Sequence, residues 1–249
     1  DVVVPYNGWL IVILISGISF LGYVLIQVVG ARRGVGLTGI LGGLASSTAV
    51  TLSLAQRSRD APGLARSFSM GVVLAWTIMF LRVLVEVAVV NVSLLRVVGV
   101  PILAMMAAGI AYAAYLYKAG DAGTEADATE LTNPFRLTPA ITFGLLYAII
   151  LVATNAAQTY FGDAGIYVTS LLSGLADVDA ITLSMARLSG PTGAVEARTA
   201  ARAIVIGAAA NTLLKGSIVF ALGTKRIRRP ILGGMAAIIA TAAGMIWFI

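Results

Sequence analysis

Long apolar runs alternate with short polar connections along the whole chain. A helix needs about 20 mostly apolar residues to cross a bilayer. Eight stretches come close to or exceed that length: residues 9–29, 35–55, 68–90, 97–117, 139–161, 165–187, 201–222 and 231–249. Turn residues such as Pro62-Gly63 and Gly190-Pro191 separate several of them. The pattern predicts an all-α integral membrane protein with about eight hydrophobic segments.

Composition agrees with this interpretation and removes several classes of function. The chain is 59% hydrophobic and 11% charged, whereas a soluble domain carries about 25% charged residues. It has no Cys and no His, which excludes disulfides, the usual zinc sites and Ser-His-Asp catalysis. The excess of 17 Lys+Arg over 11 Asp+Glu is expected to orient loops in a bilayer rather than to bind nucleic acid. We expect a multi-pass membrane protein, with the lipid bilayer as partner.

Two parts of the chain resemble each other at an offset of 131 residues. Residues 42–55 read GGLASSTAVTLSLA and residues 173–186 read SGLADVDAITLSMA, with 8 of 14 positions identical. This similarity predicts two pseudo-symmetric membrane repeats of four segments each, residues 1–117 and 139–249. An acidic polar linker, residues 118–138, joins them.

The relative orientation of the two repeats has two solutions. Four complete spans in each repeat would make the halves parallel. If the second segment is broken or re-entrant, three spans remain in each repeat and the halves are inverted. Arg32 and Arg33 precede the second segment, and Arg57, Arg59 and Arg66 follow it. Because a full crossing would place one basic cluster on the wrong side, the charges favour a re-entrant second segment.

Asp177 and Asp179 in the sixth segment are the strongest functional candidates. Each ionised Asp costs roughly 2.5–3.5 kcal/mol at the centre of a membrane helix. On a regular helix these side chains would diverge by about 200°, so they converge only where the backbone unwinds, which Gly174 makes easier. They predict a cation or proton site at a helix break, where both could ligate a hard cation such as Mg²⁺. The alternatives are an interfacial turn or a structural ion pair with a basic side chain: Lys215, Arg202 or Arg82.

The first repeat has hydroxyl groups at the equivalent positions. Ser46 and Thr48 correspond to the two aspartates, and Ser47 lies between them. Hydroxyls can ligate a cation or line a water path, and they can also bond back to helix carbonyls. Together with the aspartates they predict an ion-binding or permeation site at the repeat interface, with one charged half and one neutral half.

Other polar side chains of the apolar segments are candidates for charge compensation or gating. Arg82 and Glu86 are four residues apart and can pair on one helix face. Lys215, four residues after Asn211, is the predicted counter-charge of the aspartates. Weaker candidates, which often only join helices, are Gln27, Asn155 and Gln158.

Five stretches carry a resemblance to a known family. They are residues 14–22 (LISGISFLG), 42–59 (GGLASSTAVTLSLAQRSR), 80–91 (FLRVLVEVAVVN), 133–135 (NPF) and 162–186, which includes SGLADVDAIT. The chain resembles a prokaryotic membrane domain of unknown function, domain of unknown function 4010, that often follows an MgtC/SapB domain. The resemblance implies a multi-pass protein of a prokaryotic inner or plasma membrane. It also implies an MgtC-like partner domain and a link to magnesium or ion homeostasis. It implies no site residues.

Three classes of function compete. The first is a channel or secondary transporter for a cation, either a divalent ion such as Mg²⁺ or a proton-coupled one, with no catalytic residues and no other cofactor. The second is a non-transporting interaction or sensor module for a partner membrane protein or lipid, with the aspartates paired in a dry core. An intramembrane enzyme is disfavoured, because both acids lie in one segment without a nucleophile motif. The glycine-rich helix faces predict a homodimer.

Overall fold

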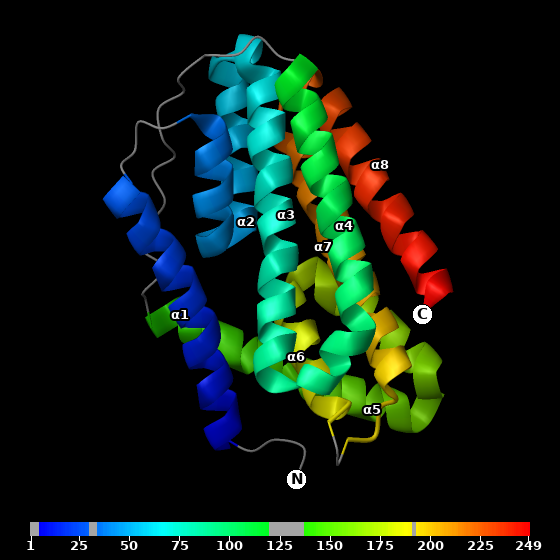
Figure 1. Ribbon diagram of the computed structural model, residues 1–249. Helices are drawn as coiled ribbons and strands as arrows, with labels where there is room; N and C mark the ends of the chain where they lie inside the picture. Colours follow the sequence, from blue (N-terminus) through cyan, green and yellow to red (C-terminus); the bar gives the residue numbers. More distant parts are fainter. Residues whose placement is uncertain (1–4, 30–33, 120–136, 191–192) are drawn as a thin grey trace.

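The predicted all-α fold is confirmed. The computed structural model describes residues 5–29, 34–119, 137–190 and 193–249, without the side chains of residues 5–9, 11, 26–29 and 137–144. Within these ranges the chain forms helices and no strand. The elements are α1 (Pro5–Val29), α2 (Val35–Asp60), η1 (Pro62–Leu64), α3 (Ala65–Val90), α4 (Val92–Ala119), α5 (Leu137–Ala176), α6 (Val178–Leu188), α7 (Ala197–Leu222) and α8 (Lys225–Phe248) (Figure 1).

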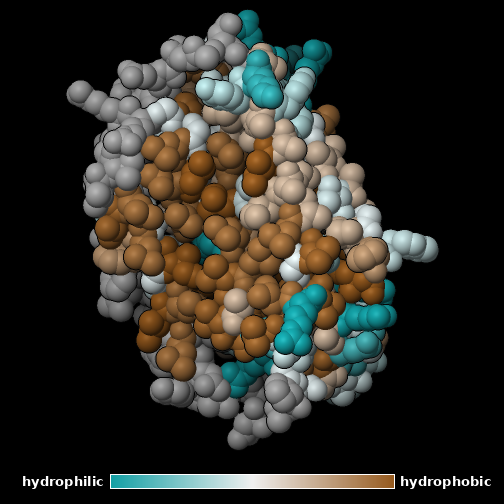
Figure 2. All heavy atoms as spheres, viewed as in Figure 1, coloured by the Kyte–Doolittle hydropathy of each residue, from teal (hydrophilic) through white to brown (hydrophobic). Residues whose placement is uncertain are grey.

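The outer surface fits a bilayer. By length and composition, the described residues contain six candidate membrane spans, in α2, α3, α4, α5, α7 and α8. Large hydrophobic side chains point outward along these helices, among them Val89, Ile110 and Leu232. Figure 2 shows hydrophobic side chains over the middle of the molecule and hydrophilic ones toward its two ends. The protein is therefore a multi-pass membrane protein.

Helix α2 is interrupted in its middle and folds back on itself. Ser46 has an extended backbone (φ −165°, ψ 104°) between two helical halves. A Cβ added at Gly71 of α3 would lie 2.8 Å from Val35 and 2.9 Å from Leu54, near the start of the first half and within the second. A straight helix would separate Val35 and Leu54 by about 28 Å. We call this re-entrant helix pair, residues 35–60, the first hairpin.

A second interruption separates α5 from α6. Asp177 has an extended backbone (φ −159°, ψ 124°) between the two helices. The last part of α5 runs in the same direction as α7, because Thr199 donates to Asp163 at 2.9 Å and Asn211 donates to the carbonyl oxygen of Gly174 at 2.8 Å.

Helix α6 runs along α3 instead. Its first turn contacts α3 through the Arg82–Asp179 ion pair. Near its end, the side chain of Asn91 donates to the carbonyl oxygen of Ala186 at 3.0 Å. Residue numbers therefore increase together along α6 and α3.

Helices α3 and α7 run in opposite directions. Contacts along the second half of α2 establish this, because that half runs with α7 and against α3. The pairs with α7 and its end are Ser47–Lys215 and Ser58–Thr224, and those with α3 are Thr51–Trp76 and Leu54–Gly71. Consequently the last part of α5 and α6 are antiparallel, and form a second hairpin, residues 163–188.

The two hairpins enter the molecule from opposite ends and their tips meet in the middle. Their interruptions, at Ser46 and Asp177, are 131 residues apart, which is the offset of the sequence repeat. Of the two arrangements that the sequence left open, this geometry fits the inverted one. The repeat limits at residues 117 and 139 stay predictions, because most of the linker lies outside the described residues.

The boundary between the predicted stretches 139–161 and 165–187 is a bend inside one helical element. Gly162 adopts φ 58° and ψ −146° inside α5, so the chain bends sharply there between two helical parts. This positive φ is readily accessible only to glycine, which explains why a helix can change direction here without a longer loop.

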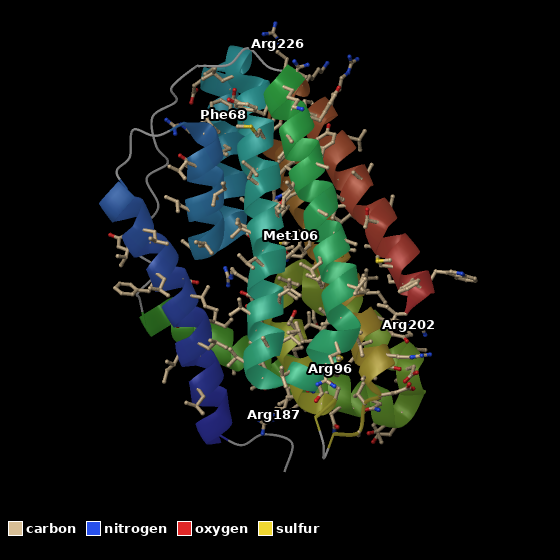
Figure 3. All side chains as sticks on the ribbon, in the orientation of Figure 1. Phe68, Arg96, Met106, Arg187, Arg202 and Arg226 are labelled. Carbon is tan, nitrogen blue, oxygen red and sulfur yellow. The ribbon has the colours of Figure 1, made fainter. Side chains whose placement is uncertain are left out.

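Charged side chains gather at the two ends of the helix bundle. Figure 3 shows Arg226 at one end and Arg96 and Arg187 at the other. In the part of the chain that the structure describes, the first end carries Arg57, Arg59, Arg66, Lys118, Lys225, Arg226, Arg228 and Arg229. The opposite end carries Arg96, Arg187, Arg198 and Arg202. The basic charge is thus concentrated where the first hairpin enters.

Candidate functional site

The candidate site is a cavity of about 310 Å³ between the two hairpin tips. Two α1 hydroxyls, Ser16 and Ser19, complete its polar lining together with groups from α3 and α7. Of the residues that the sequence singled out, the cavity is lined by Ser46, Ser47, Thr48, Arg82, Asp177, Asp179, Asn211 and Lys215. The fold therefore brings the hydroxyl side chains of the first hairpin close to the two carboxylates of the second.

Each hairpin tip begins its returning helix with a side-chain cap. The Oγ of Ser46 accepts a hydrogen bond from the backbone N–H of Ala49 at 3.2 Å. An Oδ1 oxygen of Asp177 accepts from the N–H groups of Asp179 at 2.8 Å and Ala180 at 3.3 Å. Ala49 and Ala180 are again 131 residues apart. Both returning helices thus place a capped, partly positive N-terminus at the cavity.

In each hairpin, the helical segment that precedes the break has a side-chain hydrogen-bond donor for one of its last carbonyl groups. Arg82 Nη1 donates to the carbonyl oxygen of Leu44 at 3.3 Å. Asn211 Nδ2 donates to the carbonyl oxygen of Gly174 at 2.8 Å. The last carbonyls of a helix have no intrahelical donor, so these side chains stabilise the broken ends that form the cavity wall.

Two basic side chains, one on α3 and one on α7, each contact a hairpin tip. Arg82 of α3 forms an ion pair with Asp179 in the second hairpin. Lys215 of α7 donates to Ser47 Oγ in the first hairpin at 2.7 Å and lies 2.8 Å from the sulfur of Met79. Lys215 is only 1% exposed. We call these two contacts the cross-contacts, since each joins one half of the molecule to the tip of the other.

Two predicted pairings are wrong. Lys215 was expected to pair with an aspartate, but it bonds to Ser47. Arg82, another basic partner that the sequence offered for the aspartates, pairs with Asp179. The Arg82–Glu86 ion pair does not form, and Glu86 lies close to Asp179 instead. The break at Asp177 explains the difference, because it turns the first residues of α6 toward α3 and offers Arg82 a closer carboxylate.

Two of the three weaker candidates, Asn155 and Gln158, do not line the cavity. Gln158 donates to the carbonyl oxygen of Ala194 at 2.6 Å. Asn155 is half-buried, and its backbone carbonyl accepts a hydrogen bond from Thr159 at 2.9 Å. The side chain of Gln27 lies outside the described residues. Gln158 and Asn155 therefore contribute to helix packing rather than to the site.

The donor set suits a hard cation only in part. Two carboxylates and several hydroxyls line the cavity, and these are oxygen ligands that Mg²⁺ accepts. However, Asp179 is paired with Arg82, and among the described residues no three acidic, His or Cys side chains group as in a metal site. A cation would therefore have to compete with Arg82, and the predicted Mg²⁺ site stays a prediction.

Sequence reasoning missed several residues of the cavity, among them two with hydroxyl groups and one with a sulfur atom. Ser16 and Ser19 on α1 and Met79 on α3 line it. The serines were visible as small polar residues inside the apolar stretch LISGISFLG, and their spacing of three places them on one helix face. Met79 carried no signal, because a methionine in an apolar helix is an ordinary core residue.

Comparison with known proteins places the chain in a family. The family described as "Domain of unknown function (DUF4010)" matches residues 13–223. A protein described as uncharacterized, from Aquifex aeolicus (strain VF5), is 36% identical over 193 residues, which cover 77% of this chain and 84% of the relative. No solved structure matches the chain. The match spans both hairpins and the cavity between them, and the chain belongs to the DUF4010 family.

Proposed function

We propose that this protein is a secondary transporter for a small cation, with its substrate site between the two hairpin tips. The observation that carries the proposal is the pair of helix breaks at Ser46 and Asp177, which face one cavity and bring two carboxylates to it. Discontinuous helices near the middle of the membrane are the usual substrate sites of transporters built from inverted repeats. The carboxylates and hydroxyls would replace part of the hydration shell of the cation.

The cross-contacts support a transporter rather than an open channel. Arg82–Asp179 and Lys215–Ser47 hold the tips against the long helices of the opposite halves. On this proposal, movement of a tip opens a cross-contact and admits the cation to the carboxylates from one end of the molecule. Access from one side at a time follows if the two hairpins move alternately, each toward the end of the molecule from which it enters.

The charges of the site favour a mechanism in which the arriving cation takes the place of a positive side chain beside the carboxylates. Asp177 and Asp179 are balanced by Arg82 and Lys215 in the same cavity. Because uncompensated charge is costly in a medium of low dielectric constant, an arriving cation must displace an internal positive partner. Arg82 is that partner, since it already occupies Asp179.

One observation favours a second function, a non-transporting interaction module. The Arg82–Asp179 pair is buried, and a permanent ion pair of this kind can simply hold two hairpins together. On this hypothesis the cavity has no substrate, and the family's role would lie in binding another membrane protein, such as an MgtC-like partner, or a lipid.

Flux measurements in proteoliposomes separate the two functions. Purified protein is tested for uptake of Mg²⁺, Na⁺, K⁺ and protons. The variants are Asp177→Asn and Asp179→Asn, with Asp60→Asn as a matched control on an exposed acid at the end of α2. We expect selective uptake by the natural chain and the control, and background uptake by the two site variants. Absence of uptake by the natural chain would overturn the transport proposal and favour the interaction module. Unchanged uptake by both site variants would overturn the proposed site.

A further inference from the structure

A groove lies between α5, α7 and α8, separate from the proposed substrate site. Its volume is about 480 Å³, which is within the range of sites that hold small organic ligands, about 300–1,000 Å³. It is lined by Tyr167 of α5, Arg202 and Ile206 of α7, and Ile246 and Trp247 of α8. None of these residues lines the cavity between the hairpin tips, so the groove has no explanation in the proposed transport.

The groove lies at one end of the helix bundle. The hydrogen bond from Thr199 to Asp163 fixes the register of α7 against the last part of α5. Tyr167 and Arg202 each follow one of these residues by about one helical turn, so they lie at a similar depth. Trp247 is in the last turn of α8, and Figure 3 shows Arg202 near that end of α8. Aromatic and basic side chains at the ends of membrane helices are typical of the boundary between hydrocarbon and headgroups.

Arg202 forms no ion pair with the acidic side chains that the structure describes. Its Nε atom is buried and has no hydrogen-bond partner among the described residues. The sequence offered Arg202 as a partner of the aspartates in the sixth segment, but it does not line their cavity. A guanidinium at the edge of the hydrocarbon region is costly without a counter-charge. A negatively charged group from outside the chain would remove this cost.

We propose that this groove binds a phospholipid with a net negative charge, whose phosphate pairs with Arg202 and whose acyl chain enters between Ile206 and Ile246. A guanidinium can donate two parallel hydrogen bonds to phosphate oxygens. Ile206 lies one helical turn deeper on the same face as Arg202, where the hydrocarbon of the lipid begins. Trp247 is 92% exposed, and its indole ring borders the headgroup, as interfacial tryptophans do. The inference does not depend on the proposed function.

The lining of the groove favours an anionic lipid over two other ligands. Among the described residues that line it, Arg202 is the charged one. A lipid with a net negative charge balances this side chain, whereas the ammonium group of a zwitterionic headgroup finds no partner. Free phosphate would contact the guanidinium but leave the apolar side chains uncovered, and covering them is favourable only for a ligand with a hydrocarbon part.

The test uses quenching of tryptophan fluorescence by lipids with brominated acyl chains. The full chain in detergent micelles is titrated with brominated phosphatidylglycerol, and separately with brominated phosphatidylcholine, which measures ordinary contact with lipid. Trp247→Phe identifies the part of the signal that comes from the groove. We expect phosphatidylglycerol to quench Trp247 at lower concentration than phosphatidylcholine does. Equal quenching by the two lipids would overturn the proposal, and relief of the quenching by inorganic phosphate would overturn a lipid as the occupant.

Variants of the arginine test its role in the same titration. Arg202→Gln should raise the half-quenching concentration of phosphatidylglycerol by about five-fold, the effect of losing one basic side chain beside anionic headgroups. Arg202→Lys should keep part of the preference, because it keeps the charge but not the paired donors. Arg198→Gln is the matched control on an exposed arginine one turn earlier, and should leave the titration unchanged. An unchanged titration in Arg202→Gln, or an equal effect of Arg198→Gln, would overturn the proposal.

Discussion

Ser46 and Asp177 adopt the same extended backbone conformation at the tips of opposite hairpins, and each caps the helix that follows it. One cap is a hydroxyl and the other is a carboxylate. The two hairpins therefore share a fold but differ in charge at the place where they meet. This difference lets the structural and the functional part of Asp177 be tested separately.

Substitutions of Asp177 should separate capping from ion binding. Asp177→Ser keeps a capping oxygen, as Ser46 does, and should change the free energy of unfolding little. Asp177→Ala removes the cap and should destabilise the protein by about 0.5–2 kcal/mol. Both should abolish cation uptake, because both remove the carboxylate. Unfolding titrations in detergent micelles and uptake by proteoliposomes measure the two effects, and Asp177→Ser with normal uptake would refute a role for the charge.

Arg82 and Asp179 should behave as a coupled pair. Removing one partner of a buried ion pair typically costs about 3–5 kcal/mol, because the other charge stays buried without compensation. Arg82→Gln and Asp179→Asn should each destabilise strongly, and the double variant should cost less than the sum of the two. A double-mutant cycle on unfolding free energies measures this coupling. Additive effects would mean that the pair does not hold the hairpin.

Gly174 should tolerate no larger side chain. A Cβ added there would lie 2.3 Å from the carbonyl oxygen of Gly207 and 2.6 Å from its Cα, and backbone atoms cannot rotate away. Gly174→Ala should push the second hairpin from α7 and cost about 1–3 kcal/mol. Gly244→Ala is the matched control, since nothing lies within 4 Å of its added Cβ. Equal stability of the two variants would contradict the close packing of α5 on α7.

The end with more basic side chains should face the cytoplasm. Arg226 lies at that end and Arg198 at the opposite one, and both are exposed. Cytoplasmic loops of membrane proteins are enriched in Lys and Arg. The natural chain has no cysteine, so Arg226→Cys and Arg198→Cys each introduce a single labelling site. A membrane-impermeant maleimide should label Arg198→Cys in intact spheroplasts and Arg226→Cys only after permeabilisation; the opposite result would reverse the orientation.

The sequence predicted the helix breaks better than the contacts across them. Asp177 and Asp179 could share a site only if the backbone unwound, and the break occurs at Asp177. The internal repeat pointed to the same place in the first half, where Ser46 is extended. The first inference works because it depends on local chemistry, since acids inside a membrane helix are costly. The second works because the two repeats share a sequence pattern.

The direction of each helix and the contacts between side chains could not be predicted in this way. Hydropathy gives the length of an apolar run but not whether the chain crosses or returns, so α2 passes for a full span by composition. The partner of Lys215 was mispredicted because both hairpins had to be placed before it was evident that Ser47, rather than an aspartate, lies within its reach. The missing Arg82–Glu86 pair could not be predicted either, since Arg82 turns to Asp179 on another helix.

The opposite entry of the two hairpins has a consequence for direction. On the proposed mechanism, movement of the first hairpin would lead an ion past neutral serine and threonine hydroxyls, whereas movement of the second would expose an acidic tip. The access pathways from the two sides of the membrane to the same binding site would therefore have different linings. Half-saturating concentrations measured from the two sides should then differ, and net flow should be easier to drive one way than the other.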